Sequence, residues 1–379
     1  MVKQKILTAC KKYTQLDQYF NENNTKCVLL ICDLSMQYLL INKYFDELTT
    51  RTGIRVVRFS DFKPNPLYDS VVEGVRIFHE NKCDMIVSVG GGSAMDVAKC
   101  IKVFSNMNQD ENYLKQIIVP NDIKLLVVPT TAGTGSEATR YAVIYYNGEK
   151  QSVSDCSCIP SAVLLDASAL KTLPPYQRKS TMMDAFCHSI ESFWSVNSTD
   201  ESRFYSKKAI QMIIANKDSY LANSNEGNAN MLYASNLAGR AINITQTTAG
   251  HAMCYKLTSL YGIAHGHAAS LCVSKIWPFM IEHPERCIDS RGMKYLIGIY
   301  SEIAEAMGCA TVEDAVKRYN TILRSLELSV PEPNPGDYAI LKKSVNPIRL
   351  KNHPIYLDEE AIDELYHQIL QKRGCEGEG

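Results

Sequence analysis

Residues 85–103 read MIVSVGGGSAMDVAKCIKV, and this stretch gives the strongest indication of the fold. A short β-branched run, 85–89, leads directly into three glycines and a serine, and a helix-forming segment, 94–103, follows. A strand, a glycine loop and a helix start in this order point backbone N–H groups and the positive end of a helix dipole at one place. Glycine also lets a pyrophosphate approach the backbone closely, because it has no Cβ. The stretch therefore predicts a phosphate-binding loop after a buried strand.

An ordinary tight turn between a strand and a helix would also fit these residues. The dinucleotide fingerprint Gly-x-Gly-x-x-Gly is absent, because Met95 stands where its third glycine would fall. A second loop supports the phosphate interpretation: the apolar run 125–128 leads into PTTAGTGSE, residues 129–137. The hydroxyls and glycines of this loop can wrap a diphosphate or a ribose. Two such loops together predict a nucleotide that binds through a variant loop.

The first 170 residues alternate short apolar runs with helical patterns. The runs are 27–32, 54–59, 85–89, 125–128 and 162–165. Between two of them, residues 68–81 carry apolar side chains at a period of about 3.6 residues, which is typical of a helix. This alternation predicts a parallel sheet with helices on both faces, which binds ligands beyond the carboxyl ends of its strands.

The character of the sequence changes after Leu173, Pro174 and Pro175, where long helical patterns follow one another with few strand-like runs. A proline pair is a plausible boundary, because proline is tolerated at a helix start. We therefore expect an α/β domain over residues 1–173 and an all-helical domain over residues 174–379. The Gly/Glu-rich tail, residues 374–379, is expected to be disordered.

Composition excludes several classes of protein. Forty basic against 41 acidic residues argue against a nucleic-acid-binding protein. No apolar run approaches the roughly 20 residues that a membrane-spanning helix needs, and the N-terminal residues show no signal-peptide pattern. The 13 scattered cysteines give no zinc-site or disulfide pattern, so we expect reduced thiols in a cytoplasmic protein.

Asp33 directly follows the first long apolar run. A carboxylate there can accept hydrogen bonds from a ribose and repel a 2′-phosphate, which favours NAD over NADP. It can equally cap the N-terminus of a helix. The sequence leaves both roles open.

Candidate metal ligands lie in the helical half. Residues 181–196, TMMDAFCHSIESFWSV, form a strong helical pattern in which Asp184 and His188, four residues apart, share one face. On its own, such a pair is more often a solvated surface pair. Further along, His251, His265 and His267 fall within 17 residues among small and apolar neighbours. One carboxylate with two or three imidazoles suits Fe²⁺ or Zn²⁺.

Taken together, GGGSAMDVAK, PTTAGTGSE, DAFCHSIES and GHAMCYKLTSLYGIAHGHA resemble the motifs of the iron-containing (group III) alcohol dehydrogenases, in the family's order and over nearly the whole chain. The resemblance implies a Rossmann-like dinucleotide-binding domain followed by a helical metal-binding domain, in the dehydroquinate synthase-like architecture. It also implies at least a homodimer. The positions that match the family's metal ligands are Asp184, His188, His251 and His265. The positions that match its NAD(H) contacts are Asp33, Gly90, Gly91, Gly92, Ser93, Asp96, Thr130, Thr131 and Lys150.

One departure bears on the substrate. Many family members carry a histidine four residues after the third ligand, but here Tyr255 and Lys256 stand there. This string, like residues 346–350 (NPIRL), resembles the branch that reduces phosphonoacetaldehyde to 2-hydroxyethylphosphonate. Lys256 and Arg140 are candidates to meet an anionic head group, although Lys256 equally fits a solvated helix position.

The resemblance implies hydride transfer between NAD(H) and a carbonyl bound to the metal. Tyr255, a bound water or the cofactor ribose can deliver the proton, and the sequence does not choose among them. Sulfoacetaldehyde has a similar size and charge, so its reduction is an alternative, as is oxidation of neutral primary alcohols or polyols. A non-catalytic metal or nucleotide sensor is a more distant one.

Overall fold

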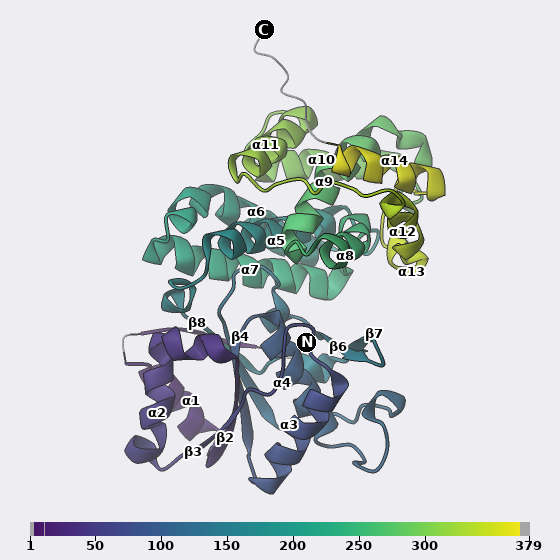
Figure 1. The fold of residues 1–379 in the computed structure, drawn as a ribbon. Helices are drawn as coiled ribbons and strands as arrows, with labels where there is room; N and C mark the ends of the chain where they lie inside the picture. Colours follow the sequence, from purple (N-terminus) through teal and green to yellow (C-terminus); the bar gives the residue numbers. More distant parts are fainter. Residues whose placement is uncertain (1–3, 11, 372–379) are drawn as a thin grey trace. The chain divides into compact units, whose positions relative to one another are not determined.

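The computed structural model describes residues 4–10 and 12–371, and the chain forms two compact units. The first unit comprises Met1–Pro174 together with Asp218–Gly239, and the second comprises Pro175–Lys217 together with Arg240–Gly379. Figure 1 shows a sheet with helices in the N-terminal part and helices alone in the C-terminal part. The fold class is therefore the one that the sequence predicts. The boundary after residue 173 stays a prediction, and the predicted tail, 374–379, lies outside the described residues.

A six-stranded parallel sheet forms the centre of the first unit (Figure 1). Its strand order is β1-β8-β5-β4-β2-β3. The strands are β1 (Lys5–Thr8), β2 (Cys27–Cys32), β3 (Arg55–Phe59), β4 (Met85–Gly90), β5 (Lys124–Pro129) and β8 (Ala162–Leu165). Every residue of β2 and β4 is buried, as expected for central strands that are covered on both faces.

The five apolar runs of the sequence are five of these six strands, with ends that differ by at most one residue. The edge strand β1 was missed, because its four residues carry only one buried side chain. The antiparallel hairpin of β6 (Tyr141–Tyr146) and β7 (Glu149–Ser154) was also missed. Its turn, Asn147-Gly148, has positive φ at both residues and is a favoured hairpin turn.

Helices cover both faces of the sheet (Figure 1). Alternate residues of β2, β4 and β5 form one core with α1 (Thr14–Glu22) and α2 (Leu40–Thr52). Two further helices, α3 (Tyr68–Glu80) and α4 (Gly92–Phe104), pack closely against each other. A Cβ added to Gly74 of α3 would collide with Ile101 of α4, so this glycine permits their close approach.

The order of the strands locates the ligand side of the sheet. The chain runs from β2 to β3 at one edge and then returns to β4 on the other side of β2. In such sheets, ligands bind at this reversal, beyond the carboxyl ends of the strands. Asp33 directly follows β2, and the glycine loop directly follows β4. Asp33 and the glycine loop thus lie at the topological switch point.

The second unit is built from helices. The helices from residue 175 onward are α5 (Pro175–Trp194), α6 (Asp200–Leu221), α7 (Asn225–Thr245), α8 (Ala249–Tyr261), α9 (His265–Glu282), α10 (Met293–Ala306), α11 (Val312–Ser325), α12 (Asp337–Ser344), α13 (Pro347–Leu350) and α14 (Glu359–Leu370). From Met182 to Trp194, α5 is buried on all sides, so its predicted apolar stripe is only part of its buried surface. No helix of the described chain has the length and apolar character that crossing a bilayer requires.

Candidate metal centre and cofactor loops

Three of the predicted metal ligands converge inside the helical unit. α5 supplies Asp184 and His188, and α8 supplies His251. One ligand atom from each lies within 4.8 Å of the others, and all three residues are buried. The Asp184 Oδ1 atom lies 3.4 Å from His251 Nε2 and 4.0 Å from His188 Nε2. The burial of the pair on α5 rules out a solvated surface pair and leaves a cluster of donors that face one another.

The fourth predicted ligand, His265, lies at the first residue of α9, beside this cluster. Its ring centre is 5.3 Å from that of His251. In addition, Cys254 Sγ lies 3.5 Å from His265 Nδ1, and the centre of the Tyr255 ring lies 5.2 Å from the centre of the His265 ring. His265 is therefore a neighbour of the compact set rather than a member of it, and its role as a ligand stays a prediction.

Small residues bring the three helices together. A Cβ on Gly266 of α9 would collide with the backbone carbonyl of Ser180 and would lie 2.6 Å from the Cβ of Asp184. A Cβ on Gly250 of α8 would collide with the carboxylate of Glu191. The two glycines therefore let α8 and α9 approach α5 closely enough to form the cluster.

Glu191 is a functional candidate that the sequence reasoning missed. Its Oε2 atom lies 2.6 Å from His251 Nδ1, and its carboxylate also accepts the backbone N–H groups of Thr248 and His251. This arrangement leaves Nε2 of His251 directed at Asp184. Metal-binding histidines usually donate their second ring N–H to such a carboxylate. A signal was present, because Glu191 falls one helical turn after His188 on the same helix.

Electrostatics favour a cation at this position. Burial alone would raise the pKa of Asp184, but His188, His251 and His265 lower it far below the ordinary aspartate range. Burial opposes a charged His251, yet Glu191 and Asp184 raise its pKa to about 9. The two buried carboxylates thus favour positive charge between them. The carboxylate of Asp184 and imidazole nitrogens are donors that Fe²⁺ and Zn²⁺ accept, so the donor set fits a divalent metal.

In the α/β unit, the two predicted loops lie side by side. The N–H of Thr130 donates to the carbonyl of Gly90 at 3.1 Å. A Cβ added to Gly91 would lie 3.6 Å from the methyl group of Thr131. The hydroxyl of Thr131 is buried and has no hydrogen-bond partner among the described residues. A glycine cradle beside an unsatisfied hydroxyl fits a diphosphate that would accept from backbone and hydroxyl donors.

Asp33 caps a short helix, which is one of the two roles that the sequence left open, while its contact with a ribose stays a prediction. Its Oδ1 atom accepts the N–H of Ser35 at 2.8 Å and caps the short helix over Leu34–Tyr38. Its Oδ2 atom would lie 3.6 Å from a Cβ on Gly90, so the second oxygen faces the glycine loop. One carboxylate oxygen of Asp33 therefore caps the helix while the other faces the glycine loop.

Lys99 is a second residue that the sequence reasoning missed. It is completely buried in α4, and its Nζ donates to Ser136 Oγ at 3.0 Å, Thr139 Oγ1 at 3.1 Å and the carbonyl of Tyr141 at 2.7 Å. It thereby ties the helix behind the glycine loop to the segment after the second loop.

Asp96 lies in the same network and accepts a hydrogen bond from Ser136 Oγ at 3.2 Å. Burial raises the pKa of Asp96 to about 6, although Lys99 and Lys150 oppose the shift. Lys150, on β7, is therefore close enough to Asp96 to act on its charge, but no contact with a cofactor tests its predicted role.

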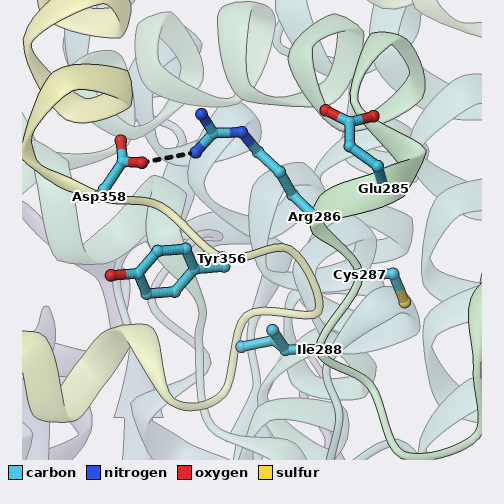
Figure 2. A pocket seen from close by; sticks show the side chains of 6 residues that line it. All are labelled: Glu285, Arg286, Cys287, Ile288, Tyr356 and Asp358. Atoms are coloured by element: carbon cyan, nitrogen blue, oxygen red, sulfur yellow. Dashed lines mark hydrogen bonds and ion pairs between the residues drawn. The ribbon is translucent and has the colours of Figure 1, made fainter.

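The other predicted residues belong to both units. Lys256 is half-buried on α8 directly after Tyr255, whereas Arg140 lies in the α/β unit with its Nε 3.2 Å from the Tyr141 hydroxyl. His267, which the sequence did not assign as a ligand, is buried with its Nδ1 3.0 Å from the hydroxyl of Tyr176. Figure 2 shows a surface pocket of the helical unit in which no predicted site residue takes part. Its lining residues are Glu285, Arg286, Cys287, Ile288, Tyr356 and Asp358.

Comparisons with known proteins identify relatives over almost the whole chain. A family model described as "Iron-containing alcohol dehydrogenase" matches residues 3–167, and one described as "Fe-containing alcohol dehydrogenase family, C-terminal" matches residues 179–344. The 1,3-propanediol dehydrogenase of Citrobacter freundii is 30% identical over 322 residues, which cover 81% of this chain and 80% of that protein. The phosphonoacetaldehyde reductase of Streptomyces viridochromogenes is 28% identical over 312 residues, which cover 78% of this chain and 79% of that protein.

A solved structure gives the same answer for the fold. The crystal structure of sulfoacetaldehyde reductase from Bifidobacterium kashiwanohense in complex with NAD⁺ matches with a TM-score of 0.83 and covers 98% of each chain. At 23% sequence identity, this likeness shows the shared fold alone.

Proposed function

This chain belongs to the iron-containing alcohol dehydrogenase family, and from that premise we propose that it reduces a small anionic aldehyde with NADH at a divalent metal. The proposed reaction converts phosphonoacetaldehyde to 2-hydroxyethylphosphonate. Hydride moves from NADH to the carbonyl carbon and a proton moves to the carbonyl oxygen, so that NADH becomes NAD⁺. The observation that carries the proposal is the buried cluster of Asp184, His188 and His251.

In this proposal Asp184, His188, His251 and His265 hold the metal. When bound, Fe²⁺ or Zn²⁺ supplies Lewis acidity toward a carbonyl oxygen. The low pKa of Asp184 keeps its carboxylate anionic at neutral pH, and Glu191 fixes the ring of His251 with Nε2 directed into the cluster. The donor set accepts either metal, and the family favours iron.

The proposed cofactor site is formed by the glycine loop, Ser93, Asp96, Thr130, Thr131 and Lys150. Asp33 supports NAD over NADP, because a carboxylate at the switch point repels a 2′-phosphate. A structural neighbour in complex with NAD⁺ supports the same cofactor. NADPH should therefore bind more weakly than NADH.

Two residues on α8 are proposed for the chemistry at the carbonyl. Tyr255 lies with its ring 5.2 Å from that of His265, which makes it the first candidate for the proton, ahead of a bound water or the cofactor ribose. Lys256, the next residue, is proposed to offset the charge of an anionic head group, and Arg140 is the second cation in that role.

The substrate class is supported by relatives with different names. The phosphonoacetaldehyde reductase and the sulfoacetaldehyde reductase both carry an anionic aldehyde in their names, whereas the 1,3-propanediol dehydrogenase names a neutral diol. We therefore keep sulfoacetaldehyde as the second substrate and neutral alcohols as the third.

Steady-state NADH oxidation by the Fe²⁺-loaded protein tests the proposal. Phosphonoacetaldehyde, sulfoacetaldehyde and butanal are compared under identical conditions, and 1,3-propanediol is offered with NAD⁺ in the reverse direction. We expect kcat/KM for phosphonoacetaldehyde to be the highest. A higher value for butanal or the diol would replace the anionic aldehyde by a neutral substrate, and NADH binding without turnover of any compound would favour a sensor.

Two further properties belong to the proposal. All 12 described cysteines are free thiols, which supports a reducing compartment such as the cytoplasm. The family resemblance supports a homodimer or a larger homo-oligomer, and light scattering of the purified protein measures that state directly.

A further inference from the structure

One arginine contacts a tyrosine that lies beside a proposed metal ligand. Arg349 lies on α13, and its Nη1 donates to the hydroxyl of Tyr255 at 2.8 Å. Its guanidinium carbon lies 4.7 Å from the centre of the Tyr255 ring. The centre of the Tyr255 ring also lies 5.2 Å from the centre of the His265 ring. Two contacts therefore lead from a guanidinium to a proposed metal ligand.

Among the residues that the structure describes, this arginine has no acidic partner. Three other arginines of the helical unit, Arg203, Arg286 and Arg291, each pair with an aspartate at 2.5–2.9 Å. Within the described residues, Arg349 contacts the hydroxyl and ring of Tyr255 and no carboxylate. A half-buried guanidinium with most of its five N–H donors still available favours an anion beside it.

The local sequence holds Arg349 in place before any ligand arrives. The side chain of Asn346 caps α13 by accepting the N–H of Ile348 at 2.9 Å. Pro347 occupies the first helical position, where its fixed φ suits a helix start. Tyr255 then orients the guanidinium by its hydrogen bond. A side chain that is fixed in this way loses less conformational entropy when it binds a ligand.

We propose that Arg349 binds the anionic head group of the aldehyde whose carbonyl lies at the Asp184–His188–His251–His265 cluster, with Tyr255 as its positioning residue. This inference rests on the proposed function and names the group that selects the substrate class. The planar guanidinium matches the geometry of a phosphonate or a sulfonate, which two of its N–H groups can contact together. Lys256 and Arg140 then have at most a supporting part.

The test compares the wild type with Arg349→Gln and Arg349→Lys. We expect Arg349→Gln to lower kcat/KM for phosphonoacetaldehyde and sulfoacetaldehyde about 100-fold more than kcat/KM for butanal, mainly through KM. An effect that acts through the Tyr255 hydroxyl is shared by all three aldehydes and cancels in this comparison. Arg349→Lys keeps the charge but not the planar fork, so it should recover part of the loss. The ratio of the two kcat/KM values of the wild type, for phosphonoacetaldehyde and for sulfoacetaldehyde, shows which of the two head groups the site prefers.

The affinity for an unreactive anion tests the role of Arg349 without any turnover. Titration calorimetry with ethylphosphonate, which cannot react, should give a dissociation constant at least tenfold higher for Arg349→Gln than for the wild type. Arg286→Gln is the matched control, because Arg286 is a half-buried arginine of the same unit that contacts the ring of Phe279. It also pairs with Asp358, as Figure 2 shows. This control should bind ethylphosphonate as the wild type does.

Failure of the inference and failure of the proposed function give different results. If the wild type prefers anionic aldehydes and Arg349→Gln keeps that preference, another residue binds the head group and the inference is wrong. If Arg349→Gln lowered kcat/KM for butanal as much as for the anionic aldehydes, Arg349 would have a structural role. The inference would then also be wrong. If the wild type itself shows no preference for anionic aldehydes, the proposed function fails first.

Discussion

Among single residues, Glu191 shows how the buried cluster is organised. It is completely buried, yet its pKa lies below the ordinary value, because His251 and the N–H of Thr248 outweigh the effect of burial. One carboxylate thus holds the ring of His251 in one orientation and accepts two backbone N–H groups. This carboxylate makes Nε2 of His251 a better donor to a cation without touching the cation itself.

Replacing this carboxylate should weaken metal binding. Glu191→Gln keeps the shape and removes the charge, so we expect the affinity for Fe²⁺ to fall about 10–100-fold. Competition with a chelator of known affinity measures it. Glu201→Gln, on the exposed side of α6, is the matched control and should leave the affinity unchanged. Equal affinity in Glu191→Gln and the wild type would show that His251 needs no carboxylate partner.

The sequence could predict these residues only in part. The spacing of Asp184 and His188 places both on one helical face, and the fold brings His251 to them as expected. Glu191 and Arg349 were missed because their partners are distant in sequence: Glu191 binds a residue 60 positions away, and Arg349 one that is 94 positions away. Local periodicity carries no information about such pairs.

At the level of elements, strands and helices were more predictable than the contacts between loops. Buried parallel strands are almost entirely apolar, so runs such as 27–32 coincide with β2. The short edge strand β1 and the polar strand β7 lack that signal. The approach of the second loop to Gly239 of α7 was also unpredictable, since nothing in the sequence near Gly135 indicates that contact.

That contact yields a prediction about Gly135. It has a φ of +60°, and an added Cβ would lie 2.5 Å from the Cα of Gly239. Gly135→Ala should therefore destabilise the protein by at least about 3 kcal/mol and should also weaken NADH binding, because the second loop must move. Urea unfolding and a fluorescence titration with NADH measure the two effects.

Gly53 provides the matched control for this substitution. It has a φ of +78° at the end of α2, with no atom within 4 Å of an added Cβ. Gly53→Ala should cost only about 1–2 kcal/mol from the backbone conformation and leave NADH binding intact. If the two variants were equally destabilised, the contact with Gly239 would have no energetic weight.

For the whole molecule, stability against acid depends on a histidine outside the ligand set. His353 is completely buried near Trp194, and neither of its ring nitrogens has a hydrogen-bond partner among the described residues. Burial lowers its pKa to about 4, although Glu191 opposes the shift. The unfolded chain therefore binds a proton at this residue below about pH 6.5, where the folded chain does not.

Because of this difference, His353 should reduce stability as the pH falls from about 6.5 toward 4. His353→Phe removes the titrating group, so the stability of the variant relative to the wild type should rise by about 2 kcal/mol between pH 7.5 and pH 5. Urea unfolding at both pH values measures it. Replacement of the exposed His79 by Gln should show no comparable change. A pH-independent difference between His353→Phe and the wild type would mean that His353 binds its proton equally well in the folded and the unfolded chain.

Removing the metal tests whether the reduction requires a metal centre at the cluster formed by α5, α8 and α9. Metal is removed with a chelator, Fe²⁺ is added back without oxygen, and bound metal and NADH oxidation with phosphonoacetaldehyde are followed together. We expect both to rise in proportion until one metal is bound per chain, and we expect His265→Ala to lose metal and activity together. Full activity in the metal-free protein would show that the reduction needs no metal at this cluster.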